Sequence, residues 1–196
     1  METRREETGT ARLVVTQNVT VDGVVAAVDD WFAPQDDGVD ASDQLDVVRE
    51  HMAGESVLLL GRRTFEDMRS YRPHQAGDTT GITAHLDAVE KAVVSRTLTD
   101  PGRANTTVLS GDPVEEVRRL VAGRDGEVGV TGSITLCHAL IGAGLPDEYR
   151  LFVHPRVLGR DRRPHLRRRG HAAHPPAGVT VSGRPRCAGR RSSGCR

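Results

Sequence analysis

The sequence predicts an α/β fold in which a central, mainly parallel mixed sheet is flanked by helices. Short apolar and β-branched segments alternate with segments of helical periodicity over residues 11–154. The segment 57–60 is apolar throughout, which is typical of a strand buried on both faces of a sheet. Strands that alternate with helices at this spacing favour parallel pairing through crossover helices.

The first half of the chain is expected to contain two strands and two helices. In order, they are a strand over residues 12–21, a turn at Asp22-Gly23, a helix over residues 42–53, a strand over residues 57–60 and a helix that opens at Thr64. Leu45, Val48 and Met52 give the first helix one apolar face. Thr64 has the chemistry of a helix cap, and Asp67 completes an acidic variant of the capping box.

The second half continues the same alternation. The expected elements are a helix over residues 84–89, strands over 91–95 and 106–109, a helix from Asp112-Pro113 to about residue 121, a strand over 127–131, a helix over 134–142 and a strand over 149–154. Asp112 is a good capping residue, and Pro113 suits the first turn of the helix that follows it.

The two ends of the chain differ in composition from the domain between them. Residues 1–10 are polar and are predicted to be a disordered leader. Residues 161–196 carry ten of the 27 Lys and Arg residues and one of the 27 Asp and Glu residues, so a charge of +9 there balances −9 in residues 1–160. This tail lacks Ile, Met, Phe, Tyr and Trp, so it buries too little apolar surface to offset its ordering entropy. We therefore place a single domain at residues 11–160.

Two interpretations of the arginine-, proline- and glycine-rich tail remain open. One is a basic arm that binds nucleic acid. The other, which we favour, is that the codons from about Asp161 onward are translated out of the ancestral frame. In that case the tail should contain no strand, and the strand over residues 149–154 should lack a neighbour on its outer edge.

Composition also excludes several classes of protein. No apolar run approaches the roughly 20 residues of a membrane span, and the polar start lacks the apolar middle of a secretory signal. The spacing of Cys137, Cys187 and Cys195 predicts neither a disulfide framework nor a zinc site. We expect a cytoplasmic protein without a metal or a membrane partner, which binds a small molecule. A homodimer is left open, and nucleic acid is not favoured as a partner.

Three predicted strands end in residues suited to binding phosphate. The first is followed by Gly61-Arg62-Arg63-Thr64, the second by Ser95-Arg96, and the third by Gly132-Ser133 at the start of a helix. In an open α/β sheet, ligands bind outside the carboxyl ends of the strands, and helix N-termini attract anions. Surface ion pairs remain an alternative role for the arginines, and simple packing remains one for Gly132.

The segments GRRTFEDM, KAVVSRTL and VTGSITLCHALI occur in this order, preceded by a TVDG turn and followed by DEYRLFVHPRVLGR. Together they resemble the dihydrofolate reductase-like superfamily, and most of all the reductase half of the bifunctional riboflavin-biosynthesis deaminase-reductase. The resemblance spans about residues 11–160. It implies a dihydrofolate reductase-like three-layer fold and binding of NADPH.

The resemblance also implies which residues bind the cofactor. The segment Gly61, Arg62, Arg63 and Thr64 would contact the pyrophosphate and the adenosine side. Ser95 and Arg96, with Arg62, would contact the 2′-phosphate, for which the guanidinium fork is well suited. Backbone amides of Gly132, Ser133, Ile134 and Thr135 would approach the pyrophosphate.

The substrate end of the site is implied to lie along the segment from Asn18 to Trp31, with His154 on the last strand. In the superfamily a carboxylate on the first helix pairs with the pterin. That slot falls at Leu45 here, so Asp46 beside it is one candidate acid and Asp22 is the other. The alternative for Asp22 is that it only caps the Asp-Gly turn.

The function implied is that of an NADPH-dependent oxidoreductase of the 5-amino-6-(5-phosphoribosylamino)uracil reductase type. It would transfer a hydride to a pyrimidine or pterin-like substrate. Two other classes remain open: a non-catalytic nucleotide-binding protein, and a nucleic-acid-binding protein that uses the basic tail.

Overall fold

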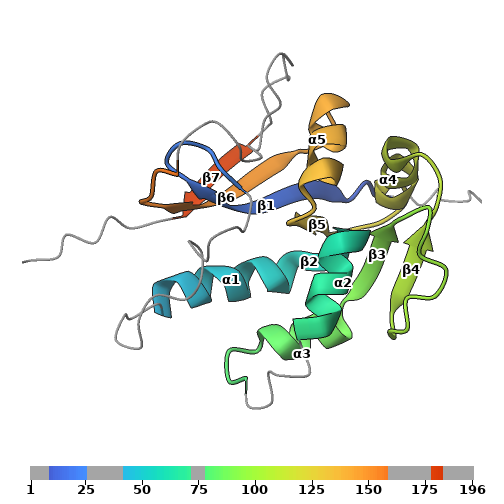
Figure 1. The fold of residues 1–196 in the computed structure, drawn as a ribbon, viewed down its shortest axis with the longest axis horizontal. Helices are drawn as coiled ribbons and strands as arrows, with labels where there is room; N and C mark the ends of the chain where they lie inside the picture. Colours follow the sequence, from blue (N-terminus) through green and yellow to red (C-terminus); the bar gives the residue numbers. More distant parts are fainter. Residues whose placement is uncertain (1–8, 26–41, 72–77, 159–177, 183–196) are drawn as a thin grey trace, which may run out of the picture.

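The computed structural model describes residues 9–25, 42–71, 78–158 and 178–182. Their seven strands form a single sheet in the order β4-β3-β2-β5-β1-β6-β7 (Figure 1). The strands are β1 (Arg12–Thr20), β2 (Glu55–Gly61), β3 (Glu90–Val94), β4 (Thr106–Leu109), β5 (Glu127–Thr131), β6 (Glu148–His154) and β7 (Gly178–Ser182). The helices are α1 (Ser42–Gly54), α2 (Arg62–Tyr71), α3 (Ile82–Ala88), α4 (Pro113–Val121) and α5 (Ile134–Gly142).

Neighbouring strands of the sheet all pair in parallel. The antiparallel part expected of a mixed sheet is not found among the described strands, although an isolated antiparallel bridge joins Thr10 to Ala122. Because the strands are parallel, their carboxyl ends meet at one edge. The segments after β2, β3, β5, β1 and β6 therefore begin along the same edge, where an open α/β sheet binds its ligand.

Helices cover both faces of the sheet, which confirms the three-layer α/β fold (Figure 1). On one face, α4 and α5 close a core of aliphatic side chains from β1, β2, β3 and β5. On the other face lie α1, α2 and α3, and there Phe65 of α2 packs with Leu58 and Leu60 of β2. The apolar run of β2 is buried on both faces, as its composition predicts.

Most of the predicted elements are confirmed, with shifts of a few residues at their ends. Asp112 caps α4 as expected, because its side chain accepts hydrogen bonds from the amides of Val114 and Glu115. The prediction that Thr64 caps a helix is wrong. Helix α2 begins at Arg62, and Thr64 lies inside its first turn, where its hydroxyl is used in another contact.

The prediction that the tail contains no strand is also wrong. Residues 178–182 form β7, which pairs with β6 in register from Glu148↔Gly178 to Phe152↔Ser182. Strand β6 therefore has a partner on its outer edge. The reading frame of the tail is not decided by this pairing, and the out-of-frame interpretation stays a prediction. Within the described residues, no helix is both long and apolar enough to cross a membrane.

Candidate functional site

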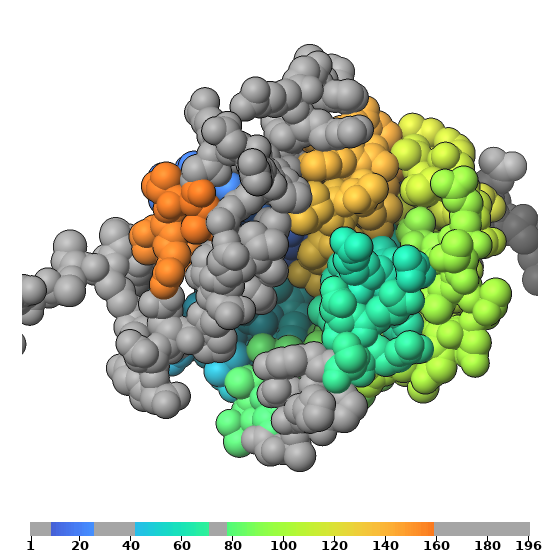
Figure 2. Space-filling model, viewed as in Figure 1, coloured from blue at the N-terminus to red at the C-terminus, as the bar shows by residue number. Residues whose placement is uncertain are grey.

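The loops after β2 and β5 are joined by a hydrogen-bonded latch between Thr64 and Ser133. The Ser133 amide donates to Thr64 Oγ1 at 2.9 Å, and the two hydroxyl oxygens lie 3.0 Å apart. Ser133 Oγ also accepts from the Gly61 amide at 2.7 Å. In the view of Figure 2 the spheres of α2 and α5 adjoin, at the edge of the sheet where both helices begin. The two loops predicted to bind one ligand are therefore held as one unit.

Backbone geometry at Gly132 and Ser133 sets the start of α5. Both residues have positive φ, +59° and +50° respectively. A Cβ added to Gly132 would lie 2.9 Å from Thr64 Cγ2, which is closer than carbon atoms pack. Contact with Thr64 therefore requires glycine at position 132. This directly supports the alternative that Gly132 serves packing. Ser133 is the N-cap residue of α5 but makes no side-chain cap, so a ligand could satisfy the first amides of the helix, which include those of Ile134 and Thr135.

The turn at Gly132 and Ser133 is also held by Gln17, a residue that was not among the predicted site residues. Gln17 of β1 is 4 % exposed, and its Nε2 donates to the Gly132 carbonyl at 2.7 Å and to Cys137 Sγ at 3.3 Å. A glutamine that alternates with Leu13 and Val15 on a core-facing strand was the available signal. Burial raises the pKa of the Cys137 thiol to about 12, so the group stays neutral.

The predicted arginines lie at the rim of this edge. Arg62 is exposed and pairs with Glu66 one turn later at 3.0 Å. Arg63 and Arg96 are exposed and form no ion pair with the residues that the structure describes. Ser95 is 8 % exposed, and its hydroxyl accepts from the amides of Thr97 and Leu98, so it shapes the turn after β3.

Asn18 and His154, two of the residues predicted to contact the substrate, lie side by side. His154 Nε2 lies 2.9 Å from Asn18 Oδ1, across the neighbouring strands β6 and β1. Burial, with a smaller effect from the Arg156 charge, lowers the pKa of His154 below its usual value. The imidazole is therefore neutral near pH 7 and can donate from Nε2 to the amide oxygen. Trp31 lies outside the described residues.

The two candidate acids differ in their placement, because Asp46 faces solvent on α1 whereas Asp22 lies in the turn after β1. The Asp46 side chain is 74 % exposed and pairs with Arg49 on the outer side of α1, whereas Leu45 is half-buried. Helix register therefore turns Asp46 away from the sheet, contrary to the prediction. Asp22 accepts from Thr20 Oγ1 at 2.6 Å and from the Leu158 amide at 3.2 Å. These contacts hold the turn after β1 against the end of β6, which agrees with the alternative that Asp22 caps the Asp-Gly turn.

The opposite edge of the sheet carries paired charges. Arg150 of β6 binds Glu127 at 2.9 Å and Glu148 at 2.8 Å, and Arg12 contacts both of these acids. Beside them, His85 Nε2 lies 2.7 Å from a carboxylate oxygen of Glu55, whose pKa burial raises. The cations at this edge are neutralised by carboxylates, unlike Arg63 and Arg96 at the carboxyl edge. The amino edge is thus a structural network.

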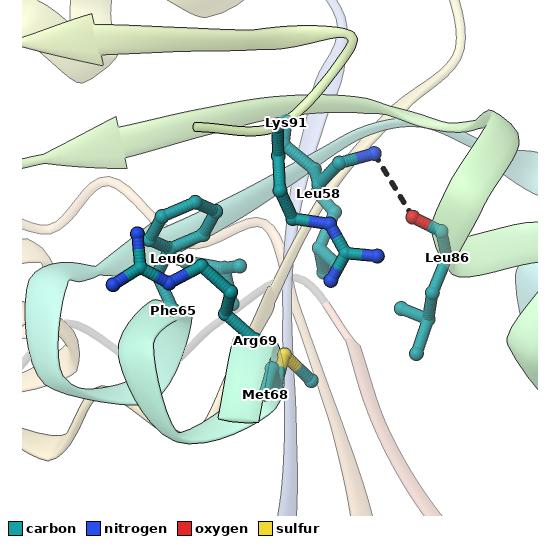
Figure 3. A pocket seen from close by; sticks show the side chains of 8 residues that line it. Leu58, Leu60, Phe65, Met68, Arg69, Leu86 and Lys91 are labelled. Atoms are coloured by element: carbon teal, nitrogen blue, oxygen red, sulfur yellow. Dashed lines mark hydrogen bonds between the residues drawn. The ribbon is translucent and has the colours of Figure 1, made fainter. Parts of the chain in front are cut away.

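A small pocket between α2, α3 and the sheet is also structural (Figure 3). Its floor includes Leu58 and Leu60, and it contains Lys91, the sole lysine of the sequence. Lys91 is 4 % exposed, and its ammonium donates to the carbonyls of Leu86 at 2.9 Å and Val89 at 2.6 Å. The charge is therefore used to satisfy carbonyls at the end of α3, where it also complements the helix dipole.

Comparison with known proteins agrees with this architecture. The model of the family described as the RibD C-terminal domain matches residues 11–176, past the predicted boundary at 160. The chain is 28 % identical over 156 residues to the uncharacterised protein YyaP of Bacillus subtilis strain 168, which covers 76 % of this chain and 77 % of that protein.

Solved structures of two enzymes share the fold. One is dihydrofolate reductase from Enterococcus faecalis, complexed with NADP(H), with a TM-score of 0.53, 18 % identity and coverage of 80 % of this chain and 78 % of that one. The other is a diaminohydroxyphosphoribosylaminopyrimidine deaminase/5-amino-6-(5-phosphoribosylamino)uracil reductase from Thermotoga maritima, with a TM-score of 0.50 and 14 % identity. That match covers 79 % of this chain and 48 % of the longer enzyme.

Proposed function

The chain belongs to the RibD C-terminal domain family, and from that premise we propose that it is an NADPH-dependent reductase. The family and the fold support a reductase-like function. The observation that carries the cofactor proposal is the latch between Thr64 and Ser133, because it joins two glycine-containing strand ends beside an uncapped helix start and exposed arginines. This donor set suits a ligand with several phosphate charges.

The residues that would hold the cofactor fall into two groups. The amides at the start of α5, with those near Gly61, would hold the pyrophosphate. Arg62 and Arg96 would hold the 2′-phosphate that distinguishes NADPH from NADH. Arg62 already pairs with Glu66, but both side chains are accessible, so the guanidinium can exchange this partner for a phosphate.

The substrate would lie beside β1 and β6. Bound NADPH would supply a hydride. The chain's own residues would orient the acceptor ring, and the hydrogen-bonded pair Asn18 and His154 supports a role for these two side chains in doing so. Because Asp46 faces solvent and Asp22 is engaged by Thr20 and the Leu158 amide, we propose that a proton comes through water or the imidazole. The substrate class would be a pyrimidine or pterin-like heterocycle of the riboflavin-pathway type.

The cofactor proposal is tested by comparing NADPH and NADH in a variant that lacks both proposed 2′-phosphate ligands. Arg62→Ala with Arg96→Ala should weaken NADPH about tenfold to a hundredfold, since one charge-assisted hydrogen bond contributes about 1.5–3 kcal/mol. NADH affinity should change little. Arg119→Ala, on the exposed side of α4, removes a similar charge far along the chain and serves as the control.

Equal weakening of the two cofactors would contradict the assignment of the 2′-phosphate site. A turnover assay with a panel of pterins and pyrimidines then separates an enzyme from a non-catalytic nucleotide-binding protein. Tight NADPH binding without oxidation in the presence of any substrate of the panel would favour the binding protein.

A further inference from the structure

The peptide group that joins Gly132 to Ser133 is held from both sides. On one side, its carbonyl accepts from Gln17 Nε2 at 2.7 Å and from the Cys137 thiol at 3.3 Å. On the other side, its N–H donates to Thr64 Oγ1 at 2.9 Å. Gln17 and Cys137 are both buried, so the carbonyl faces the core and the N–H faces the loop after β2.

The backbone at this peptide group is strained. Ser133 has a φ of +50°, a conformation that costs free energy for residues other than glycine. A flip of the peptide group changes ψ of Gly132 and φ of Ser133, and it would return φ of Ser133 to the common negative range. The observed orientation therefore needs contacts that the flipped orientation lacks.

Thr64 does not by itself choose between the two orientations. A hydroxyl can accept from an N–H or donate to a carbonyl, so Thr64 could bond to the peptide group in either orientation. The donors on the core side do distinguish them, because a flip would take away their acceptor. Gln17 makes the shorter of these two contacts, and a buried amide without a partner is costly. Gln17 therefore decides which way the peptide group faces.

This orientation matters for an anion at the start of α5. The first intrahelical bond of α5 runs from the Cys137 amide to the Ser133 carbonyl, so the amides of residues 134–136 precede it. The Ser133 and Gly61 amides already donate within the latch, which leaves the amides of residues 134–136 for the pyrophosphate. A flip would turn the Gly132 carbonyl toward the same edge of the sheet, where its partial negative charge would repel an anion.

We propose that Gln17 is a positioning residue of the cofactor site, because it holds the Gly132–Ser133 peptide in the orientation that keeps the carbonyl away from the pyrophosphate. This inference rests on the proposed reductase function and deepens it. Gln17 acts through the turn and does not contact the cofactor, since its side chain lies in the core against Cys137 of α5.

The first test compares two probes that share the adenosine 2′-phosphate and differ in the pyrophosphate. NADP⁺ has both groups, whereas adenosine 2′-monophosphate has only the first. Gln17→Met keeps the length of the side chain and removes the donor. In calorimetric titrations of the full chain, it should weaken NADP⁺ about tenfold or more and adenosine 2′-monophosphate by less than about threefold.

Two further variants make this comparison decisive. Val15→Ala changes the core on the same strand and the same face, so it controls for general loss of stability and should leave the ratio of the two affinities unchanged. Gln17→Leu removes the same donor, and it replaces Gln17→Met if circular dichroism shows that the latter does not fold.

A conservative variant tests whether the donor is what matters. Gln17→Glu has nearly the shape of the wild type, and at about pH 6 burial keeps its carboxyl protonated, so it still donates to the Gly132 carbonyl. At this pH it should bind NADP⁺ within about threefold of the wild type. A loss as large as that in Gln17→Met would contradict the role of the donor.

Hydrogen exchange tests the peptide group itself in the cofactor-free chain. Exchange of the Ser133 amide should be about tenfold or more faster in Gln17→Met than in the wild type, measured by NMR relative to the Val130 amide. Val130 lies in β5 and is fully buried, so its amide reports global opening. Val15→Ala should accelerate both amides together.

Several outcomes would overturn the proposal. They are equal weakening of the two probes in Gln17→Met, unchanged NADP⁺ affinity in that variant, or unchanged relative exchange of the Ser133 amide. Failure of the wild-type chain to bind NADP⁺ would instead count against the proposed function. Hydrogen exchange would then still decide whether Gln17 holds the peptide group.

Discussion

The latch between Thr64 and Ser133 gives the sharpest prediction about this molecule. Thr64→Val keeps the shape of the side chain but removes the acceptor of the Ser133 amide, and it also breaks the hydroxyl contact at 3.0 Å. An amide left without a partner in a buried place costs about 1–3 kcal/mol. Because these groups are only partly buried, we expect a loss of about 1–2 kcal/mol in the free energy of unfolding.

A loss of this size corresponds to a fall of about 2–8 °C in Tm for a chain of this length. Urea unfolding provides the measurement, with Thr64→Ser as the matched control, since serine keeps the hydroxyl and loses only the methyl group. NADPH affinity should fall in Thr64→Val and be largely retained in Thr64→Ser, because the latch aligns the loops that would bind the pyrophosphate.

A double variant that combines Thr64→Val with Ser133→Ala measures the hydroxyl contact that the two residues share. Ser133→Ala removes the acceptor of the Gly61 amide and the same hydroxyl contact to Thr64. Each single variant loses this contact. The loss of unfolding free energy in the double variant should therefore be about 0.5–1.5 kcal/mol smaller than the sum of the two single losses. Strictly additive losses, or a Thr64→Val protein as stable as the wild type, would refute the latch.

Three further predictions follow from other parts of the chain. Gly132→Ala should destabilise the fold by about 1 kcal/mol or more, and the loss should be smaller in a Thr64→Ser background, which removes the methyl group 2.9 Å from the new Cβ; an equal loss in both backgrounds would contradict this contact. Burial raises the pKa of Glu55 above its ordinary 4.5, so the folded protein favours the protonated form, and stability should fall as pH rises from about that value through the raised pKa. Glu55→Gln, which can still bond to His85, should flatten this part of the urea-unfolding profile. Finally, translating the coding DNA beyond codon 160 in its other two frames should reveal alternating, β-branched segments; if neither frame does, the printed tail, including β7, is the ancestral one.

Much of the fold could be predicted from the sequence because its signals are local. Asp112 caps α4 through amides two and three residues away, so the residues needed to recognise it stand together in the chain. The apolar run 57–60 and the alternation of strands and helices likewise predict parallel pairing. The carboxyl edge of the sheet, with its glycine-containing loops and its arginines, follows from that pairing.

The tertiary structure decided what each polar side chain does at this edge. Thr64 has the chemistry of a helix cap, but its hydroxyl binds Ser133, 69 residues later, and the local prediction is wrong. Strand β7 was missed although Val179, Thr180 and Val181 are typical strand residues, because this segment is only five residues long and its pairing depends on the open edge of β6. A strand at the edge of a sheet depends on its neighbour as well as on its own residues.

The register of α1 shows the same division between sequence and structure. The sequence determined that this helix has an apolar face and that Leu45 and Asp46 stand side by side in it. Only the packing of the helix on the sheet decided that Leu45 turns inward and Asp46 faces solvent beside Arg49. Propensity and periodicity arise from neighbours along the chain, whereas a binding site is made by groups far apart in sequence, so its hydrogen-bond partners are fixed only when the sheet assembles.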